Sequence, residues 1–292
     1  MHLFVQALIL GLLMGGVYAL MASGLTLVFG IMRVINVAQG ALIIMGAYLS
    51  YTLFTHFHID PFVGALVIAP VVFVLGVGLQ LAFIRPLDER DREELSLLVT
   101  WAFALGIEGV LSYAYSTTYR ASIPGYANRA WDVAGYRVPE VRVFAFGLSI
   151  GTIALLYLLL ARTRFGRSVR ATVQNPVSAR LLGVDTAWVS AVGFGLGAAT
   201  AAIAGAVFGI VFPFNPGSHY DLISRLLSII VLGGLGSLGG AIVAAMLMGS
   251  TEAVFQVEIS PTWSPLTFFV LLIVILLVRP QGLFGITARG AA

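Results

Sequence analysis

The sequence contains no cysteine and no lysine, and it has few charged residues of any kind. Without cysteine among its 292 residues, the chain has no disulfide bond, no thiolate metal ligand and no cysteine nucleophile. All 16 basic residues are arginine, so the lysine that binds phosphate in a P-loop is missing, and no G-x-x-x-x-G-K-[ST] motif occurs. If the protein performs ATP-driven work, the ATP site must therefore be on a partner.

Charged residues make up only 10% of the chain, whereas a soluble domain has about 25%. Hydrophobic residues make up 59%, and the mean hydropathy is +1.00. Several apolar runs approach the length of about 20 residues that an α-helix needs to cross the hydrocarbon core of a bilayer. We therefore predict an all-α, polytopic transmembrane helical bundle that forms a single domain over residues 1–292, rather than a soluble protein with one large core.

The apolar runs determine the expected number of membrane crossings. They lie at residues 3–30, 37–56, 61–84, 96–119, 143–161, 188–212, 223–257 and 264–278. The run 223–257 is long enough for two passes if the segment "GGLGSLGG" interrupts it, since glycine has no Cβ and turns easily. We therefore expect eight or nine crossings with broken helices, and we expect Ser237 to bind backbone groups that the break leaves free. The residues of this predicted helix break are Gly233, Gly234, Gly236, Ser237, Gly239 and Gly240.

Glycines also recur at short spacing within the apolar runs, as in "GFGLGAATAAIAGAVFG" at 193–209. Small residues three or four positions apart allow two helices to approach closely. We expect tight helix packing here, with a hinge as the alternative.

The distribution of arginine predicts the orientation in the membrane. The loop 162–187 has five arginines and one acid, Asp185, and short arginine-rich loops remain in the cytoplasm. The loop 85–95 lies two crossings earlier and is therefore cytoplasmic too, which makes 120–142 external and the C-terminus cytoplasmic. The net charge of +3 is small and lies in loops, which is typical of membrane orientation and not of nucleic-acid binding.

The stretch "RVINVAQGALIIMGAY" at 33–48 places polar side chains between two apolar runs. A backbone break at membrane depth is tolerated only where it is buried in protein or lines a water-filled cavity. Asn36 and Gln39 therefore either pack between helices, with Asn36 as the N-cap of the following helix, or line a translocation pathway, or lie in a simple surface turn. Arg33 is expected at a membrane interface, because its charge is costly at the midplane.

Two acids lie inside the apolar runs, and such acids are functional candidates. We expect Glu252 near an external helix end. For Glu108 a buried hydrogen-bonded pair and a proton-linked role remain open. The pair "HFH" at 56–58 has no further ligand at a workable spacing, so we predict no metal site.

Four blocks of the sequence resemble a known family. They are "GGVYALMASGLTLVFGIMRVINVAQGALIIMGAY", "RFGRSVRATVQNPVSARLLGVD", "VLGGLGSLGGAIVAA" and "VRPQGLFG". In this order they are similar to the branched-chain amino acid permeases of bacterial ATP-driven importers, and to the shorter of the two permease subunits. The resemblance implies a multi-pass inner-membrane transport subunit that has neither catalytic residues nor a cofactor. It also implies four kinds of partner: a second homologous permease, two cytoplasmic ATP-binding subunits, a periplasmic substrate-binding protein and the lipid bilayer.

The chain departs from the family pattern at one place. Where the family reads Phe-Ala-His-Gly-Glu, this chain has "VAQGA", so Gln39 and Ala41 replace two ionisable residues. The cargo therefore remains open between branched-chain amino acids and related amino acids, amides or urea. A stand-alone channel for a small polar solute such as urea is the alternative function.

With this resemblance, the loop 162–187 is interpreted as the element that couples to the ATP-binding subunits. Residues 167–174 are compatible with a helix, Asn175 and Pro176 mark a break, and a second helical turn at 178–182 ends at Gly183. We expect Leu181 and Leu182 to pack beneath a polar contact face. An ordinary arginine-rich loop without a partner is the alternative. The predicted coupling residues are Arg167, Arg170, Gln174, Asn175, Leu181 and Leu182.

Overall fold

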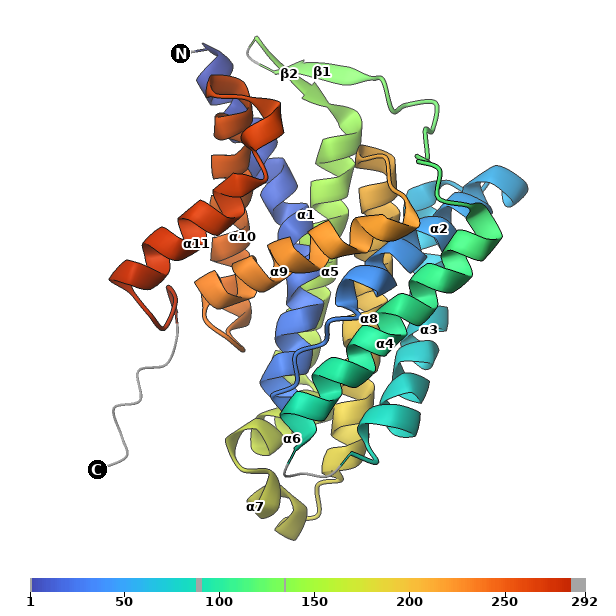
Figure 1. The fold of residues 1–292 in the computed structure, drawn as a ribbon, viewed down its shortest axis with the longest axis vertical. Helices are drawn as coiled ribbons and strands as arrows, with labels where there is room; N and C mark the ends of the chain where they lie inside the picture. Colours follow the sequence, from blue (N-terminus) through green and yellow to red (C-terminus); the bar gives the residue numbers. More distant parts are fainter. Residues whose placement is uncertain (1, 88–90, 134, 285–292) are drawn as a thin grey trace.

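The computed structural model describes residues 2–87, 91–133 and 135–284, and these residues form helices and one short hairpin (Figure 1). The long helices are α1 (His2–Met32), α2 (Gln39–Phe57), α3 (Pro61–Leu79, continued by a π-helical turn Gln80–Ile84), α4 (Arg92–Tyr115), α5 (Glu140–Arg162), α8 (Thr186–Val211) and α10 (Leu238–Glu258). The shorter helices are α6 (Arg164–Gln174), α7 (Pro176–Leu181), α9 (His219–Gly233) and α11 (Leu266–Val278). The hairpin pairs β1 (Ala130–Val133) with β2 (Tyr136–Pro139), with Ala130 opposite Pro139.

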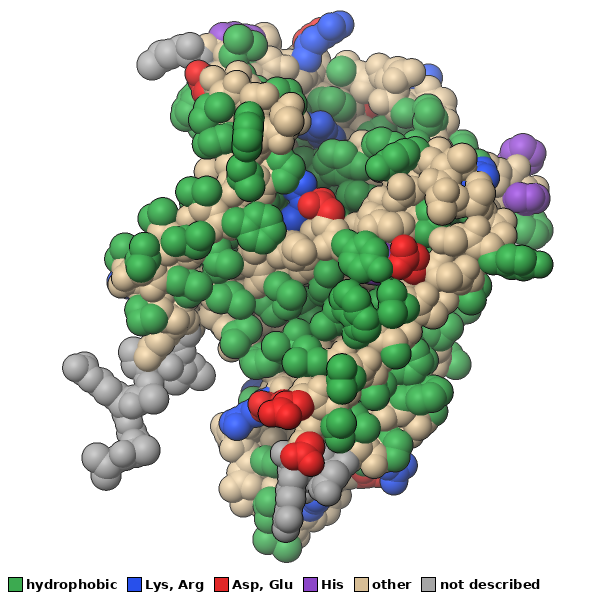
Figure 2. All heavy atoms as spheres, in the orientation of Figure 1, with side chains coloured by type: hydrophobic (Ala, Val, Ile, Leu, Met, Phe, Trp, Pro, Cys, Tyr) green, Lys and Arg blue, Asp and Glu red, His purple; other side chains and the backbone are tan. Residues whose placement is uncertain are grey.

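Seven of the described helices are long and apolar enough to cross a membrane, which confirms the predicted polytopic helical bundle. Helix α11 is also apolar but has only 13 residues, and α9, which carries Asp221 and Arg225, has 15. The eighth and ninth predicted crossings would fall on these two. Figure 2 shows that hydrophobic side chains cover most of the middle of one face, as expected of a surface in contact with lipid.

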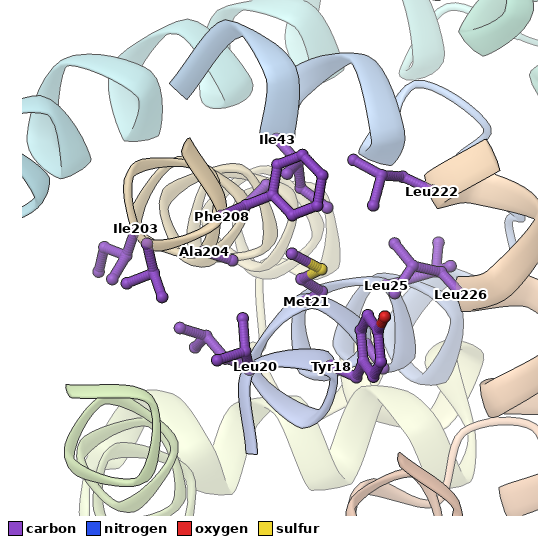
Figure 3. Close-up of a cluster of buried hydrophobic side chains, with 14 of the residues drawn as sticks. Tyr18, Leu20, Met21, Leu25, Ile43, Ile203, Ala204, Phe208, Leu222 and Leu226 are labelled. Carbon is purple, nitrogen blue, oxygen red and sulfur yellow. The ribbon is translucent and has the colours of Figure 1, made fainter. Parts of the chain in front are cut away.

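The core of the bundle lies around α1 and α8. Helix α8 is the most buried of the candidate spans, and α2 and α3 pack against it on the side away from α10. Figure 3 shows buried side chains of α1, α2, α8 and α9 that converge, among them Met21, Ile43, Phe208 and Leu226. This arrangement brings the polar side chains of several helices into the same interior.

Helices α2 and α8 approach so closely that their contact requires glycine. A Cβ on Gly205 would lie 1.9 Å from the carbonyl oxygen of Ile43, and a Cβ on Gly46 would lie 2.6 Å from the carbonyl oxygen of Ala202. The predicted tight packing of the 193–209 segment is confirmed, because these distances leave no room for a side chain.

The glycine-rich interruption also lies where the sequence predicts it. Helix α9 ends at Gly233, and Gly234 and Gly236 follow with φ of 95° and 81°, a region that glycine adopts without strain. The hydroxyl of Ser237 accepts a hydrogen bond of 3.1 Å from the Gly240 backbone, so it caps the start of α10 as expected.

The hairpin and the α6–α7 pair lie at opposite ends of the molecule (Figure 1). Helix α5 connects them with 23 residues, which corresponds to about 35 Å of helix. The segment before the hairpin is held in place by Arg120, which exchanges backbone hydrogen bonds of 2.9 and 2.8 Å with Phe214. The orientation predicted from arginine places the α6–α7 end in the cytoplasm, and residues 285–292 lie outside the described part of the chain.

Candidate functional site

Helices α1, α5, α8, α9 and α10 surround a cavity of about 730 Å³ near the hairpin end of the molecule. Figure 2 shows positive and negative side chains together in a hollow in the upper half of this face. The apolar lining includes Leu10, Met14, Phe208, Phe212 and Leu222, and the polar lining includes Tyr18, Arg142, Asn215, Asp221, Arg225, Glu252 and Gln256. The cavity thus combines opposite charges with an apolar wall.

An ion pair between α9 and α10 forms the centre of the polar lining. Arg225 donates to Glu252 Oε1, and its side chain is 12% exposed against 16% for Glu252. Tyr18 of α1 donates a hydrogen bond of 2.9 Å to the other carboxylate oxygen, Oε2. Arg225 also donates to Asp221 Oδ2 at 2.8 Å and lies 4.9 Å above the ring of Phe268. Both charges of the pair are therefore neutralised locally, and α1, α9 and α10 are tied together.

The sequence singled out Glu252 but not its partner. Arg225 and Glu252 lie on separate helices on either side of the glycine-rich break, so no spacing rule links them. One feature of the sequence could have indicated that Arg225 is a site residue. Asp221 and Arg225 form an i,i+4 pair at the start of an apolar run, where charges are costly.

Arg142, in the first turn of α5, is a second cation of the cavity. It is half-buried, and within the described residues it makes no hydrogen bond or ion pair. A guanidinium has five N–H donors. Arg142 therefore has all of its donors available to water or to an anionic group in the cavity.

We expect that Arg225→Leu lowers the thermal stability of the purified protein in detergent. The substitution leaves Glu252 largely buried with Tyr18 as its one partner, and breaking a buried pair costs about 3–5 kcal/mol. The double variant Arg225→Leu/Glu252→Leu should recover much of the loss, because no buried charge remains unpaired and Asp221, which also loses its Arg225 partner, is 60% exposed. A double variant that melts below the single one would contradict this account.

Glu108 has a hydrogen-bonded environment in the structure. It accepts a 2.9 Å bond from the Tyr220 hydroxyl, and His219 Nε2 lies 3.9 Å from the same carboxylate. Glu108 is therefore hydrogen-bonded, as one alternative of the sequence analysis had it, but the pair is partly exposed and not buried, and the partners come from the start of α9. Among the described residues, no group of three His, Cys, Asp or Glu side chains is placed to hold a metal ion.

Asn36 and Gln39 lie in a packed joint between α1, α2 and α8. Both side chains are 0% exposed. Asn36 Nδ2 donates to Gln39 Oε1 at 3.3 Å, and Gln39 Nε2 donates to the Gly197 carbonyl of α8 at 3.2 Å. In this conformation neither residue lines the cavity described above.

The expectation that Asn36 is the N-cap of α2 is wrong. Ala38 occupies that position, and no side chain caps the helix. Gln39 N, the first backbone donor of α2, bonds to the backbone carbonyl of Asn36. In the turn before the helix, Val37 N bonds to the hydroxyl of Thr100. The Asn36 side chain is thereby free to reach Gln39 instead.

The loop 162–187 forms two short helices, as expected. Helix α6 ends at Gln174, and Asn175 Oδ1 accepts a 3.0 Å bond from Ser178 N, which caps α7. Gly183 follows with φ of 83°. The predicted break and the end at Gly183 are confirmed.

Two details of this loop differ from the expectation. Leu181 and Leu182 were expected to pack beneath the polar contact face, but they are 84% and 83% exposed in the single chain. The residue that α7 buries is Ala179. Arg170 is exposed as expected, but it also donates through Nη1 to the Leu160 carbonyl at the end of α5, so part of its guanidinium is bound to the bundle. Arg167, Gln174 and Asn175 are exposed as expected.

A second cavity, of about 450 Å³, lies beside α6 and α7. Arginines from four segments line it, and these are Arg33, Arg85, Arg92 and Arg180. The expected position of Arg33 near an interface agrees with this place at the end of α1, beyond the apolar interior. The positive charge at this end agrees with a cytoplasmic location.

A polytopic helical bundle with a polar cavity near one end and two short, basic helices at the other has the architecture of a membrane transport subunit. The family model described as "Branched-chain amino acid transport system / permease component" matches residues 7–276. The chain belongs to this family of permeases.

Several curated proteins are similar along nearly their whole length. The chain is 30% identical to the high-affinity branched-chain amino acid transport system permease protein LivH of Salmonella typhimurium, over 97% of this chain and 96% of the relative. It is 28% identical to the corresponding protein BraD of Pseudomonas aeruginosa, over 97% and 96%. It is 29% identical to a probable branched-chain amino acid transport permease protein LivH of Methanocaldococcus jannaschii, over 91% and 88%.

A solved structure shares the fold. PsaBC from Streptococcus pneumoniae, in complex with a Fab, aligns with a TM-score of 0.50 and 12% identity, over 96% of this chain and 93% of that one. This similarity concerns the fold alone.

Proposed function

We propose that this chain is one of two homologous permease subunits that form the membrane pathway of an ATP-driven importer for branched-chain or related amino acids. It forms a single transmembrane domain in a bacterial inner membrane, with residues 162–187 as the coupling loop. Two ATP-binding subunits dock on the cytoplasmic side, and a periplasmic substrate-binding protein delivers the cargo at the hairpin end. The family and the similar proteins LivH and BraD, which are branched-chain amino acid transport permeases, support the cargo class.

One observation carries this proposal. The polar cavity begins at Arg142 in the first turn of α5, and the exposed α6–α7 pair follows the last turn of the same helix. A solute site and a docking surface thus lie at opposite ends of one helix, as an importer with a separate energy source requires.

The docking surface for the ATP-binding subunits is the exposed apolar patch of α6 and α7, formed by Val173, Val177, Leu181 and Leu182. Apolar side chains of a short helix that protrude next to arginines are typical of a helix that inserts into a groove of a partner. Arg167, Gln174 and Asn175 are exposed around this patch and supply polar contacts. The partner must provide the ATP site, because this chain has no lysine.

The proposal is tested with the complete complex in proteoliposomes. Radiolabelled leucine should accumulate only with the binding protein outside and ATP inside, and leucine should stimulate ATP hydrolysis. Downhill passage of urea without ATP would instead support the stand-alone channel and overturn the proposal.

We further propose that Asn36 and Gln39 border the pathway when it opens. They are buried polar groups at the joint between α2 and α8, and opening of this joint would bring them into contact with the solute.

We therefore expect Gln39→Leu to lower leucine uptake several-fold while the complex still assembles, since each of its two lost side-chain hydrogen bonds costs only about 0.5–1.5 kcal/mol. Ser50→Ala is the matched control, because Ser50 is a buried residue of α2 without a hydrogen-bond partner among the described residues. Uptake by Gln39→Leu equal to that of the control would remove these residues from the pathway.

A further inference from the structure

The charges of the cavity near the hairpin end are only partly matched with one another. Glu252 accepts bonds on both oxygens, from Arg225 and from Tyr18. Arg142 has no bonded acceptor within the described residues. The cavity therefore contains one internally neutralised pair and one cation that is open to the space between the helices.

The same cavity also contains the carboxylate of Asp221, which has an oxygen without a hydrogen bond from the described residues. Asp221 accepts a hydrogen bond from Arg225 on Oδ2 and is 60% exposed. Its other oxygen, Oδ1, accepts no hydrogen bond from the described residues. A carboxylate has about four acceptor positions, so Asp221 retains the capacity to bind a cation in the cavity.

A ligand that satisfies both groups must have a negative and a positive end. Arginine binds a carboxylate through two parallel N–H bonds, and an ammonium group donates to a carboxylate such as that of Asp221. A neutral amide or urea would leave Arg142 without a counter-charge, which is costly for a half-buried cation, and would leave Asp221 with Arg225 as its one bonded partner among the described residues. The charge pattern is therefore complementary to a zwitterion.

The rest of the cavity fits the apolar part of such a molecule. Leu10, Met14 and Phe208 contribute to an apolar wall beside the charged groups. A volume of about 730 Å³ lies within the range of about 300–1,000 Å³ of small-molecule sites. This volume is large enough for an amino acid of leucine size together with water.

We propose that this cavity is a recognition site for zwitterionic amino acids within the permease itself, in which Arg142 binds the α-carboxylate and Asp221 binds the α-ammonium group. The Arg225–Glu252 pair with Tyr18 is a positioning element that holds Asp221 toward the cavity through Arg225. The inference rests on the proposed function, because it assigns residues to the proposed amino-acid cargo. Selection of the cargo is then shared between the binding protein and the permease.

The test measures binding and transport by the complete complex in nanodiscs and in proteoliposomes. Binding of radiolabelled L-leucine without the binding protein is competed with L-leucinamide, which lacks the carboxylate, and with 4-methylpentanoate, which lacks the ammonium group. Unlabelled leucine should compete at least about tenfold better than either analogue, because each analogue loses a charged hydrogen-bonding partner.

The variants separate the two ends of the ligand. Arg142→Gln should lose about tenfold or more in leucine binding and should no longer distinguish leucine from leucinamide. Asp221→Asn should lose the discrimination against 4-methylpentanoate. Arg142→Lys should retain part of the binding, since it keeps the charge and loses the paired donors. A merely structural role of either residue would instead lower the melting temperature of the purified complex, which is expected to remain at the wild-type value.

Two results would overturn this inference and leave the proposed function intact. One is ATP-driven leucine uptake by the wild type together with unchanged binding and unchanged discrimination in both variants. The other is wild-type uptake with no detectable leucine binding at millimolar concentration without the binding protein. If the wild-type complex transports no amino acid with ATP, the proposed function itself fails.

Discussion

Replacing Leu181 and Leu182 by glutamate is expected to release the ATP-binding subunits from the complex while the membrane bundle remains folded. The two side chains are 84% and 83% exposed in the single chain, and burying a leucine side chain contributes about 1.5–3 kcal/mol. The double substitution removes both buried leucine contacts and places two negative charges in an apolar groove of the partner. It should therefore weaken docking by at least about a hundredfold. The purified variant is examined for its content of ATP-binding subunits and for leucine-stimulated ATP hydrolysis.

Val133→Glu is the matched control, because Val133 is an exposed apolar residue of β1 at the opposite end of the molecule. It should retain both ATP-binding subunits. Full subunit content and wild-type stimulation in the Leu181→Glu/Leu182→Glu variant would show that the loop 162–187 is an ordinary arginine-rich connection.

Arg170→Glu is a less direct test of the same surface. Its guanidinium binds the Leu160 carbonyl at the end of α5, so the substitution also disturbs the junction between α5 and α6. Substitution of Asn175 removes the cap of α7, at a cost of about 1 kcal/mol. Gln174→Ala avoids both effects and is expected to weaken docking without a change in thermal stability.

The second large effect is expected at the contact between α2 and α8. Gly205→Ala would place a Cβ 1.9 Å from the carbonyl oxygen of Ile43 and 2.9 Å from Ala47 N. Overpacking typically costs about 1–3 kcal/mol, and the cost should lie at or above the upper end here because backbone atoms cannot rotate away. The two helices must separate, which also breaks the bond between Gln39 and Gly197. We expect a strongly reduced yield and a lower melting temperature in detergent.

Gly151→Ala on α5 provides the comparison for this variant. Among the described residues, no heavy atom beyond the adjoining backbone of α5 lies within 4 Å of a Cβ at that position, so alanine should be tolerated and should stabilise the helix by up to about 1 kcal/mol. Equal melting temperatures for Gly205→Ala and the wild type would mean that α2 and α8 are not closely packed.

Several features of this protein follow from the sequence because they depend on neighbouring residues. The apolar runs predict the helices, since each backbone group in a membrane must be bonded within its own segment. The glycines at 233–240 and the Asn175–Pro176 step predict breaks, because φ, ψ and a missing Cβ are local properties. The capping bonds of Ser237 and Asn175 reach only three residues along the chain, and the expectation for Ser237 and the break predicted at Asn175 agree with the structure.

Other features depend on which helices meet, and a single sequence does not contain that information in any local pattern. The joint of Gln39 with Gly197, and the turn of Arg170 toward Leu160, arise from the packing of separate segments. The N-cap prediction for Asn36 failed for this reason, because α2 begins only at Gln39 and the Asn36 amide bonds instead to the Gln39 side chain, which is bound to α8. Leu181 and Leu182 were expected beneath a contact face, but a six-residue helix buries only the residue that faces the bundle.

The sequence by itself determined that this is a helical membrane protein with an arginine-rich loop at residues 162–187, because hydropathy and charge act along the chain. The tertiary structure alone decided that Arg142, Asp221, Arg225 and Glu252 share one cavity. These residues come from three helices, and their charges meet only after α1 and α8 have packed at the centre of the bundle. The physical reason is that charges on different helices pair only when those helices are held at a fixed distance and angle. Helix packing provides this geometry, and no local sequence pattern contains it.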